Sequence, residues 1–551
     1  MATPQFDAII VGSGAGGGVV AGVLAANGWK VALVEKGRQQ YPTLGAKALR
    51  GSLYGNDEIK KRRYFAFQDP LIEPRVYKIN GAPTYSTGDI QGLTVGVGGG
   101  TITYAGDSPR LMEDDFKILS RFGKVDGADV VDWPITYQDL EPYYDETERI
   151  IGVQGLAGAD PFAAARRPYP MPPGAQNVAE NTLVKGAVAC GLHPHPMPIA
   201  VNSIYYRGRP ACVNCGWCDY GCPINAKGST AVTVIRDAIL SGNLTLITEA
   251  CVTRVDTEPS GARAAGVTFL DKDGKPQSIT GNHVVIACNA IETPRLMLES
   301  ASAAHPGGLG NGSGLVGRYL MFHVVFNVIA VFAQELRSYR GRLIKQACAD
   351  FMIPDGSAGW VRGGYLELGG AIMPVEFGVS LPIEVHKEFM VDGKYRRRIA
   401  PLSVMGEDVP QRDNRVELDP SVKDVYGRAA PRSTYSYHAH DLAMIDRYTP
   451  RMVDVAKAAG AVETMPMDMS QHYGAPDTKH LLGTTRMGDD PAASVCDRWG
   501  RLHEVENVWI ADGSTWPTSA GFNPVLTQQA LAYMTAACMV NPTDPKAVIP
   551  K

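Results

Sequence analysis

The sequence predicts an α/β protein whose first element is a dinucleotide-binding unit. The apolar run DAIIVG has the composition of a buried strand, and Gly12-x-Gly14-x-x-Gly17 follows it directly. The helix-like VVAGVLAANG and a second strand-like run, KVALVEKG, come next. A strand, a glycine-rich turn, a helix and a second strand in this order form the unit that binds the pyrophosphate of a dinucleotide.

The three glycines and one carboxylate of this unit have separate expected roles. Gly12 allows the tight turn, Gly14 lets the backbone approach the pyrophosphate, and Gly17 lets the helix pack closely on the strand. The N-terminus of the helix then faces the negative charge. Glu35 ends the second strand, where a carboxylate can accept a hydrogen bond from an adenosine ribose. These features predict a dinucleotide but do not separate NAD from FAD.

Length and composition narrow the class of protein. A chain of 551 residues can form two intertwined domains, and 45% hydrophobic with 20% charged residues is typical of a soluble globular protein. The net charge of -4 gives no basic surface for nucleic acid. The apolar run LMFHVVFNVIAVFA is too short to span a membrane and predicts a buried strand. The start, MATPQFDAIIVG, lacks the basic region and cleavage site of a signal peptide.

Three later segments favour FAD over NAD. The first is GLTVGVGGGTITYAGDSPR, where glycines let the backbone lie against a flat, bulky group, although a flexible surface loop is the alternative. The others are HVVIACNAIETPRLMLESA and VWIADGST, in which Asp512 stands at the carboxyl end of a predicted strand, where open parallel sheets bind ligands. The sequence has no second GxGxxG that stands between a strand-like run and a helix-like run as the first one does, so we expect no separate NAD site. The predicted cofactor-binding residues in these segments are Gly98, Gly99, Gly100, Thr101 and Asp512.

The last part of the chain supplies candidates for chemistry. His480 opens HLLGTTRMG, and Asn523 lies in GFNPVLTQQALAYM, which predicts a loop leading into a helix N-terminus. This arrangement can place a base, a hydrogen-bond donor and a helix end around one point. A histidine held in a structural role is the alternative for His480. Earlier in the chain, YTPRMVDVAKAAGA predicts an amphipathic helix with Pro450 near its start.

The chain resembles the glucose-methanol-choline (GMC) oxidoreductases over nearly its whole length. The motifs that carry the resemblance run from VGSGAGGG through GVGGGT, LVGRYLMFH and ETPRLMLES to HLLGTTRMG and GFNPVLTQQALA. Within the family it most resembles the catalytic subunits of bacterial FAD-dependent glucose and gluconate dehydrogenases, as DWPITYQDLEPYY and RRPYPMPP indicate.

This resemblance implies a fold of two parts. One is a discontinuous α/β FAD-binding (Rossmann-like) domain, and the other is an α+β substrate-binding domain with an antiparallel sheet. By the same likeness, the FAD-binding domain gathers residues 1–50, 85–110, 225–318 and 470–551. The substrate-binding cap then consists of residues 51–84, 111–224 and 319–469, with the cysteine-rich segment 212–222.

The resemblance also implies roles for single residues. His480 matches the histidine that takes the alcohol proton while the hydride moves to flavin N5, and Asn523 matches its partner. Pro524, beside Asn523, is placed with the cofactor-binding residues. Some relatives attach the flavin through a histidine just after the glycine-rich loop, but here Thr101 to Tyr104 contain none, so we expect noncovalent FAD. His323, after GRYLMF, matches a histidine common in the family, at the cap–FAD interface or at the substrate.

A cysteine-rich run, ACVNCGWCDYGCPINAKG, is the second distinctive feature. Its C-x2-C-x2-C-x3-C-P spacing is that of bacterial ferredoxins and predicts an iron–sulfur site. Structural zinc, disulfides and free thiols are the alternatives. The resembling sugar dehydrogenases suggest a [3Fe-4S] cluster here, although their cysteine spacing differs. The predicted metal ligands are Cys212, Cys215, Cys218 and Cys222.

Together these features predict an FAD-dependent oxidoreductase that oxidises an alcohol, such as a sugar or glycoside hydroxyl, to a carbonyl. Electrons would leave through the iron–sulfur cluster to a cytochrome c. By resemblance, a small chaperone-like subunit would be a further partner, so the chain is expected in the cytoplasm or, by co-export with that partner, in the periplasm. Two alternatives are a cluster-free oxidase that uses oxygen and a flavin-bound electron-transfer subunit without a substrate of its own.

Overall fold

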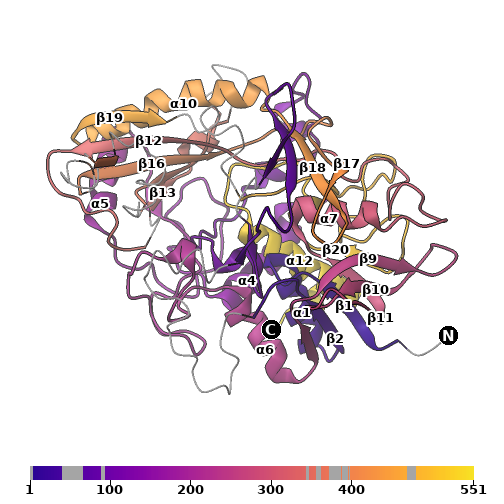
Figure 1. Ribbon diagram of the computed structural model, residues 1–551. Coiled ribbons are helices and arrows are strands. Elements are labelled where there is room, and N and C mark those ends of the chain that lie inside the picture. The colour runs from indigo at the N-terminus through magenta and orange to yellow at the C-terminus, as the bar shows by residue number, and fades with distance from the viewer. Residues whose placement is uncertain are drawn as a thin grey trace.

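A computed structural model of the chain describes residues 4–39, 66–88, 93–342, 346–354, 362–370, 386–387, 395, 397–467 and 479–550. The predicted fold class, an α/β domain together with an antiparallel sheet, is confirmed: two main sheets occupy different halves of the molecule (Figure 1). Each sheet has its own hydrophobic core. The cavity described below lies between these two halves.

The first sheet contains the predicted dinucleotide-binding strands. Its order is β8-β2-β1-β11-β10-β9, and β20 pairs with β11. The pairs β8–β2, β2–β1, β1–β11 and β11–β20 are parallel, whereas β10 pairs antiparallel with β9 and β11. Ile9 lies between Ala32 and Val284, and all three are fully buried. The strands are β1 (Phe6–Val11), β2 (Val31–Val34), β8 (Leu244–Ile247), β9 (Cys251–Thr257), β10 (Ala264–Leu270), β11 (Pro276–Ile286) and β20 (Val508–Ile510).

Helices cover this sheet and bring the two ends of the chain together. α1 (Ala15–Ala26) packs against α12 (Val525–Val540) and α6 (Val234–Ser241). α12 is buried along nearly its whole length because α1 and α4 (Tyr137–Ile151) pack against it. α7 (Asn289–Glu299) follows β11, as the sequence predicts.

The second sheet is antiparallel and has the order β19-β12-β16-β15-β13-β7. The predicted buried strand in LMFHVVFNVIAVFA is β12. Its residue Val325 pairs with Met405 of β16. α10 lies across this sheet at the top of Figure 1, beside α5. The elements are β7 (His195–Pro196), β12 (Val324–Phe332), β13 (Gln346–Cys348), β15 (Gly364–Leu368), β16 (Ile399–Gly406), β19 (Ala461–Met467), α5 (Val178–Ala189) and α10 (Ala439–Ala458).

The start predicted for α10 near Pro450 is wrong. The helix begins at Ala439, after His438, whose Nδ1 accepts a hydrogen bond from the His440 N–H at 3.1 Å. Pro450 lies inside the helix. A histidine is an uncommon N-cap, so this start had no strong signal in the sequence.

A third sheet joins distant parts of the chain in the order β17-β18-β4-β5. Its strands β4 and β18 are parallel. β5 belongs to a range predicted for the FAD-binding domain, yet it pairs with β4 from a range predicted for the cap, so the domain boundaries stay a prediction. The remaining elements are β3 (Ala66–Phe67), β4 (Arg75–Ile79), β5 (Ser86–Gly88), β6 (Thr94–Val95), β17 (Arg415–Lys423), β18 (Ala429–Tyr435), α3 (Ile118–Phe122) and the 3-10 helices η2 (Gly99–Ile102), η3 (Glu113–Phe116), η4 (Cys218–Tyr220), η5 (Thr230–Val232), η6 (Asp350–Met352), η7 (Gly513–Thr515) and η8 (Pro545–Val548).

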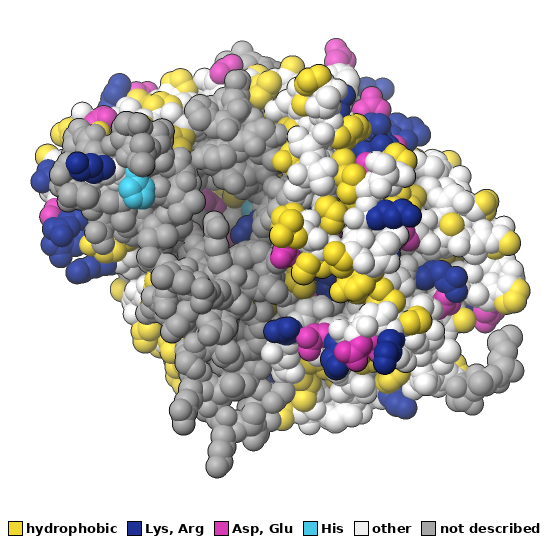
Figure 2. Space-filling model, viewed as in Figure 1, with side chains coloured by type: hydrophobic (Ala, Val, Ile, Leu, Met, Phe, Trp, Pro, Cys, Tyr) yellow, Lys and Arg dark blue, Asp and Glu magenta, His cyan; other side chains and the backbone are white. Residues whose placement is uncertain are grey.

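The surface view agrees with the composition. In the described part of the face in Figure 2, basic and acidic side chains are interspersed with hydrophobic ones. Within the described residues, none of the helices has the length and hydropathy needed to cross a membrane.

Candidate active site

The turn between β1 and α1 is packed tightly against the ends of two neighbouring strands. Gly12 has a φ of +94°, and a Cβ there would lie 2.4 Å from the Ala287 carbonyl oxygen. A Cβ on Gly17 would lie 2.0 Å from the Gly12 carbonyl oxygen, as expected for a close helix–strand contact. The tightest position is Gly16, where a Cβ would lie 1.5 Å from the Ala511 carbonyl oxygen. Our sequence analysis missed Gly16, although the glycine run GAGGG was its signal.

Gly14 and Gly100 have a different environment, because a Cβ at either would meet no protein atom within 4 Å. Both line a cavity of about 560 Å³. α1 begins beside this open space without an acidic residue in its first turn, so its exposed N–H groups favour an anion there. Bare backbone, room and a helix N-terminus together fit the pyrophosphate of FAD.

Glu35 is buried at the dinucleotide end of the cavity and supports the turn. Its Oε2 accepts hydrogen bonds from the Ser13 N–H at 3.1 Å and the Ser13 hydroxyl at 2.6 Å, and its Oε1 accepts from the Gly37 N–H at 2.8 Å. The Ser13 Oγ also accepts from the Gly98 N–H at 3.0 Å. Glu35 therefore connects the first turn to the glycine-rich loop, and its contact with a ribose stays a prediction.

The glycine-rich loop lies against the same turn. Gly98 and Gly99 have positive φ values of 103° and 48°, and a Cβ on Gly99 would lie 2.9 Å from the Gly14 Cα. The Thr101 hydroxyl donates to the Gly98 carbonyl at 2.6 Å and accepts from the Thr230 N–H at 3.1 Å. The segment predicted to lie against a flat, bulky group thus forms a short 3-10 helix, and hydrogen bonds to Ser13 and Thr230 hold it in place.

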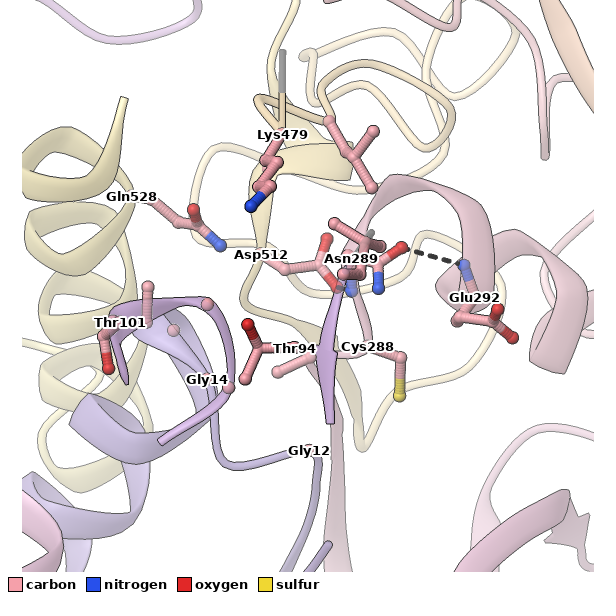
Figure 3. A pocket seen from close by; sticks show the side chains of 18 of the residues that line it. Gly12, Gly14, Thr94, Thr101, Cys288, Asn289, Glu292, Lys479, Asp512 and Gln528 are labelled. Carbon is pink, nitrogen blue, oxygen red and sulfur yellow. Dashed lines mark hydrogen bonds between the residues drawn. The ribbon is translucent and has the colours of Figure 1, made fainter. Parts of the chain in front are cut away.

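Asp512 connects the end of β20 to the start of α7. Its carboxylate accepts hydrogen bonds from the Ser514 N–H at 2.8 Å, the Asn289 N–H at 3.0 Å and the Thr293 hydroxyl at 2.5 Å. Burial raises the pKa of Asp512, and these donors offset part of that effect. Asn289 in turn accepts from the Glu292 N–H at 3.1 Å, shown as the dashed line in Figure 3.

His480 lines the cavity and contacts a second histidine. Its Nδ1 lies 2.8 Å from Nδ1 of His323, and the two rings are nearly perpendicular, at 83°. His323 is fully buried, whereas His480 is half-buried and open to the cavity. Burial, His323 and Lys479 together hold the pKa of His480 well below its usual range. His480 is therefore a neutral base at neutral pH.

Asn523 and Pro524 line the cavity at the N-terminus of α12, and Glu367 of β15 lies nearby. Burial raises the pKa of Glu367 to about 8, and a hydrogen bond from Asn523 lowers it in part. Oδ1 of Asn523 and Oε1 of Glu367 are buried without a hydrogen-bond partner in the described part of the chain. Such oxygens are costly unless a ligand or water satisfies them.

The rest of this cavity wall comes from residues that the sequence analysis missed. Val325 and Met405, from the paired strands β12 and β16, line it together with Asp107. Lys479 and Gln528 point toward the space above Gly14 (Figure 3). Asp107 and Gln528 lie in segments that the sequence analysis had singled out for the cofactor or for chemistry, whereas Val325, Met405 and Lys479 reach the site only through the fold. The predicted residues that line the cavity are Gly12, Gly14, Glu35, Gly99, Gly100, Thr101, His480, Asp512, Asn523 and Pro524.

The described structure gives no support to the metal site predicted in the cysteine-rich run. In the described residues, no group of three or more His, Cys, Asp or Glu side chains is arranged to hold a metal ion. The ten cysteines of the chain, all within the described ranges, form no disulfide. Burial raises the pKa of Cys218 to about 12, so this thiol is neutral at physiological pH. The residues present therefore give no support to a cluster at Cys212, Cys215, Cys218 and Cys222.

One cation connects this run to the glycine-rich loop. Lys227 is fully buried, and its ammonium donates to the carbonyls of Ile102 and Tyr104, both at 2.7 Å, and to the carbonyl of Cys218. The run therefore packs behind the loop that lines the cavity.

Comparisons with known proteins find similar sequences over nearly the whole chain. Two sequence profiles described as GMC oxidoreductase match residues 96–325 and 410–532. The 2-methyl-1,2-propanediol dehydrogenase of Mycolicibacterium austroafricanum is 32% identical over 96% of this chain and 94% of its own. The fructose dehydrogenase large subunit of Gluconobacter japonicus is 29% identical over 98% of both chains. The paromamine 6'-oxidase of Streptomyces fradiae is 31% identical over 96% of this chain and 90% of its own.

The fold also matches a solved structure. Pyridoxine 4-oxidase from Mesorbium loti superposes with a TM-score of 0.65 over 96% of this chain and 98% of its own, at 17% identity. Both profiles carry the same family description, and the first relative is more than 30% identical over nearly the whole chain, so the chain belongs to the GMC oxidoreductase family, whose members bind FAD and oxidise hydroxyl groups.

Proposed function

We propose that the protein oxidises a primary or secondary alcohol to a carbonyl with noncovalently bound FAD, and that His480 is the catalytic base. The observation that carries the proposal is the position of His480. Its imidazole lines the same cavity as Gly14 and Gly100, the glycines that leave room for the cofactor, and as Asn523 at the start of α12. A neutral base, an amide and a cofactor cradle thus share one enclosed space.

His480 and Asn523 would act together on the hydroxyl group of the substrate. Bound FAD would accept the hydride from the carbinol carbon. His480 would take the hydroxyl proton, a role worth roughly 10²–10⁴-fold in rate. The amide of Asn523 would donate to the developing alkoxide oxygen without changing its own charge. The depressed pKa of His480 supports this assignment, since the free base is present over a wide pH range.

The substrate end of the cavity favours a small molecule with more than one hydroxyl group. Glu367, with a pKa of about 8, is mostly protonated at neutral pH and can both donate to and accept from a hydroxyl. The unpaired Oε1 of Glu367 and Oδ1 of Asn523 are open to such partners, whereas Val325 and Met405 provide apolar contacts. The relatives named above for a diol, for fructose and for paromamine support a polyhydroxylated substrate.

The route by which electrons leave is a separate part of the proposal. No electron transfer through a cluster is proposed, because in the described residues no group of His, Cys, Asp or Glu side chains is arranged to hold a metal ion. Oxygen or an external acceptor would then reoxidise the enzyme. A cytochrome c and a small chaperone-like subunit stay predictions, supported by one relative that is named as a large subunit.

Two measurements test the proposal. The first quantifies flavin and iron on one anaerobically purified sample: one flavin and no iron is expected, whereas about three or four irons per chain would restore the cluster. The second follows anaerobic flavin reduction by polyols in the wild type and in His480→Ala. The variant should keep its flavin but lose roughly 10²–10⁴-fold in reduction rate. An unchanged rate in His480→Ala would contradict the role of His480. A wild-type flavin that no polyol reduces would favour an electron-transfer subunit instead.

A further inference from the structure

The contact between His323 and His480 also determines which ring nitrogens carry a hydrogen. His323 stands directly before β12 and is enclosed on two sides. Its Nε2 lies 3.1 Å from the carbonyl oxygen of Ser519, and its Nδ1 lies 2.8 Å from Nδ1 of His480. Each ring nitrogen of His323 therefore has a hydrogen-bond partner, a carbonyl at Nε2 and an imidazole at Nδ1. A backbone hydrogen bond with Ala520 acts on its pKa in the same direction as the one with Ser519.

The partner at Nε2 decides where the proton of His323 lies. A carbonyl oxygen can only accept, so the Nε2 of His323 must donate to Ser519. Burial lowers the pKa of His323 to about 4, and this ring is neutral at physiological pH. A neutral imidazole has one N–H, so Nδ1 of His323 keeps its lone pair and can only accept.

The position of the hydrogen on His480 follows from that on His323. Because Nδ1 of His323 accepts, Nδ1 of His480 must carry the hydrogen in the 2.8 Å contact. His480 is also neutral, so its Nε2 has no hydrogen and presents a lone pair. We propose that His323 is a positioning residue that holds His480 in the Nδ1–H tautomer and thereby makes Nε2 the atom that takes the substrate proton. That the proton comes from a substrate rests on the proposed function, whereas the tautomer of His480 does not depend on it.

A separate residue fixes both ends of this chain of hydrogen bonds. The Asp408 N–H donates to the Ser519 Oγ at 2.8 Å, and that hydroxyl donates back to the Asp408 carbonyl at 2.9 Å. The Asp408 carboxylate accepts from the N–H of Phe322 at 2.6 Å and from the Tyr435 hydroxyl at 2.8 Å. Asp408 thus holds the residue before His323 and the residue that accepts its Nε2–H, so the ring has little freedom to turn.

An imidazole at position 323, rather than a carboxylate, leaves the pKa of His480 low. A carboxylate at the same position would fix the same tautomer but would also raise the pKa of His480. A neutral His323 fixes the tautomer without that effect. Lys479 also lowers the pKa of His480. The other charged or titratable groups that line the same cavity are Glu35, Lys36, Glu73, Tyr104, Asp107, Asp219, Cys251, Cys288, Glu292, Glu367, Arg428 and Asp512.

The direct test observes the ring nitrogens. Nitrogen-15 NMR of histidine-labelled protein, with and without FAD, separates the two tautomers by their long-range couplings to the ring hydrogens. We expect His480 as Nδ1–H and His323 as Nε2–H in both samples, with assignment by His480→Gln and His323→Gln. A His480 signal from the Nε2–H tautomer would overturn the inference without reference to any activity.

Variants of His323 give a second readout. His323→Phe removes the acceptor and should lower kcat by roughly 10²-fold at nearly unchanged KM and flavin content. His323→Asp should keep the tautomer, recover part of kcat and move the acid limb of the kcat/KM profile to higher pH. His438→Gln is the matched control and should leave kcat unchanged, because His438 caps α10 and contacts the Asp126 carbonyl, and it does not line the cavity.

The two proposals fail in different ways. If His480→Ala keeps full activity, the proposed function is wrong whatever the tautomer. If His480→Ala is inactive but His323→Phe has wild-type kcat, and His323→Asp has an unshifted pH profile, only the role of His323 is wrong.

Discussion

The cavity has two walls that are built in different ways. The wall that faces the dinucleotide is made of backbone: Gly12, Gly14 and Gly99 bring the chain close because they lack side chains. The wall that faces the substrate is made of side chains, such as Glu367 and Met405, from strands of the antiparallel sheet. A dinucleotide pyrophosphate demands a close backbone approach, whereas a substrate is distinguished by the side chains that contact it. The first wall should therefore respond to substitution through folding and FAD binding, and the second through specificity and pH.

The largest effect is expected where the backbone wall meets the core. Gly16→Ala would place a Cβ 1.5 Å from the Ala511 carbonyl oxygen, and backbone cannot move aside cheaply. We expect a loss of more than about 3 kcal/mol in the free energy of unfolding. Thermal denaturation or soluble yield measures it. Gly88→Ala, where a Cβ meets no atom within 4 Å and φ is not positive, is the control. A stable Gly16→Ala protein would contradict the described packing of this turn.

A smaller, selective effect is expected at Gly14. A Cβ there contacts no protein atom within 4 Å, and the φ of -65° suits any residue. Gly14→Ala should therefore fold normally but bind FAD at least about tenfold more weakly, because the methyl group enters the space left for the pyrophosphate. Titration of the flavin-free protein with FAD measures the affinity. If affinity is unchanged, the cofactor does not approach the backbone at Gly14.

Lys227 tests the connection between the backbone wall and the cysteine-rich run. Lys227→Met removes the donor for three carbonyls, two of them in the glycine-rich loop. We expect a loss of about 1–3 kcal/mol in the free energy of unfolding, together with weaker FAD binding. Lys272→Met, which changes an exposed lysine in a surface ion pair, should stay within about 0.5 kcal/mol of the wild type. Equal stability of the two variants would mean that the run does not support the loop.

The difference between the walls explains how much the sequence could predict. The fingerprint at Gly12, the loop at Gly100 and the helix after Asn523 follow local rules, and the structure has all of them at one cavity. Glu367 could not be predicted, since its place depends on strand pairing between distant segments. The cysteine-rich run shows the opposite case. Its spacing is that of a cluster, but the positions of its thiols depend on how the loop folds over Lys227.

The smallest expected effect is on the pH dependence of stability. It comes from Glu367, which belongs to the substrate wall. Its pKa is about 8 in the folded protein and 4.5 in an ordinary environment, so the folded state binds the proton more tightly. The contribution of this group to stability is therefore greatest below pH 4.5 and decreases as pH rises toward 8. Glu367→Gln removes this dependence, so its Tm should fall less than that of the wild type between these two pH values.

The same substitution separates stability from substrate binding. Glutamine keeps a donor and an acceptor at every pH, so KM for a polyol should stay constant in the variant, whereas in the wild type it should rise above about pH 8 as the carboxyl ionises. Glu463→Gln, on an exposed position of the same sheet, should follow the wild type in both measurements. Identical Tm and KM profiles for Glu367→Gln and the wild type would mean that this carboxyl is already charged at neutral pH, and the substrate wall would then suit a cation rather than a neutral polyol.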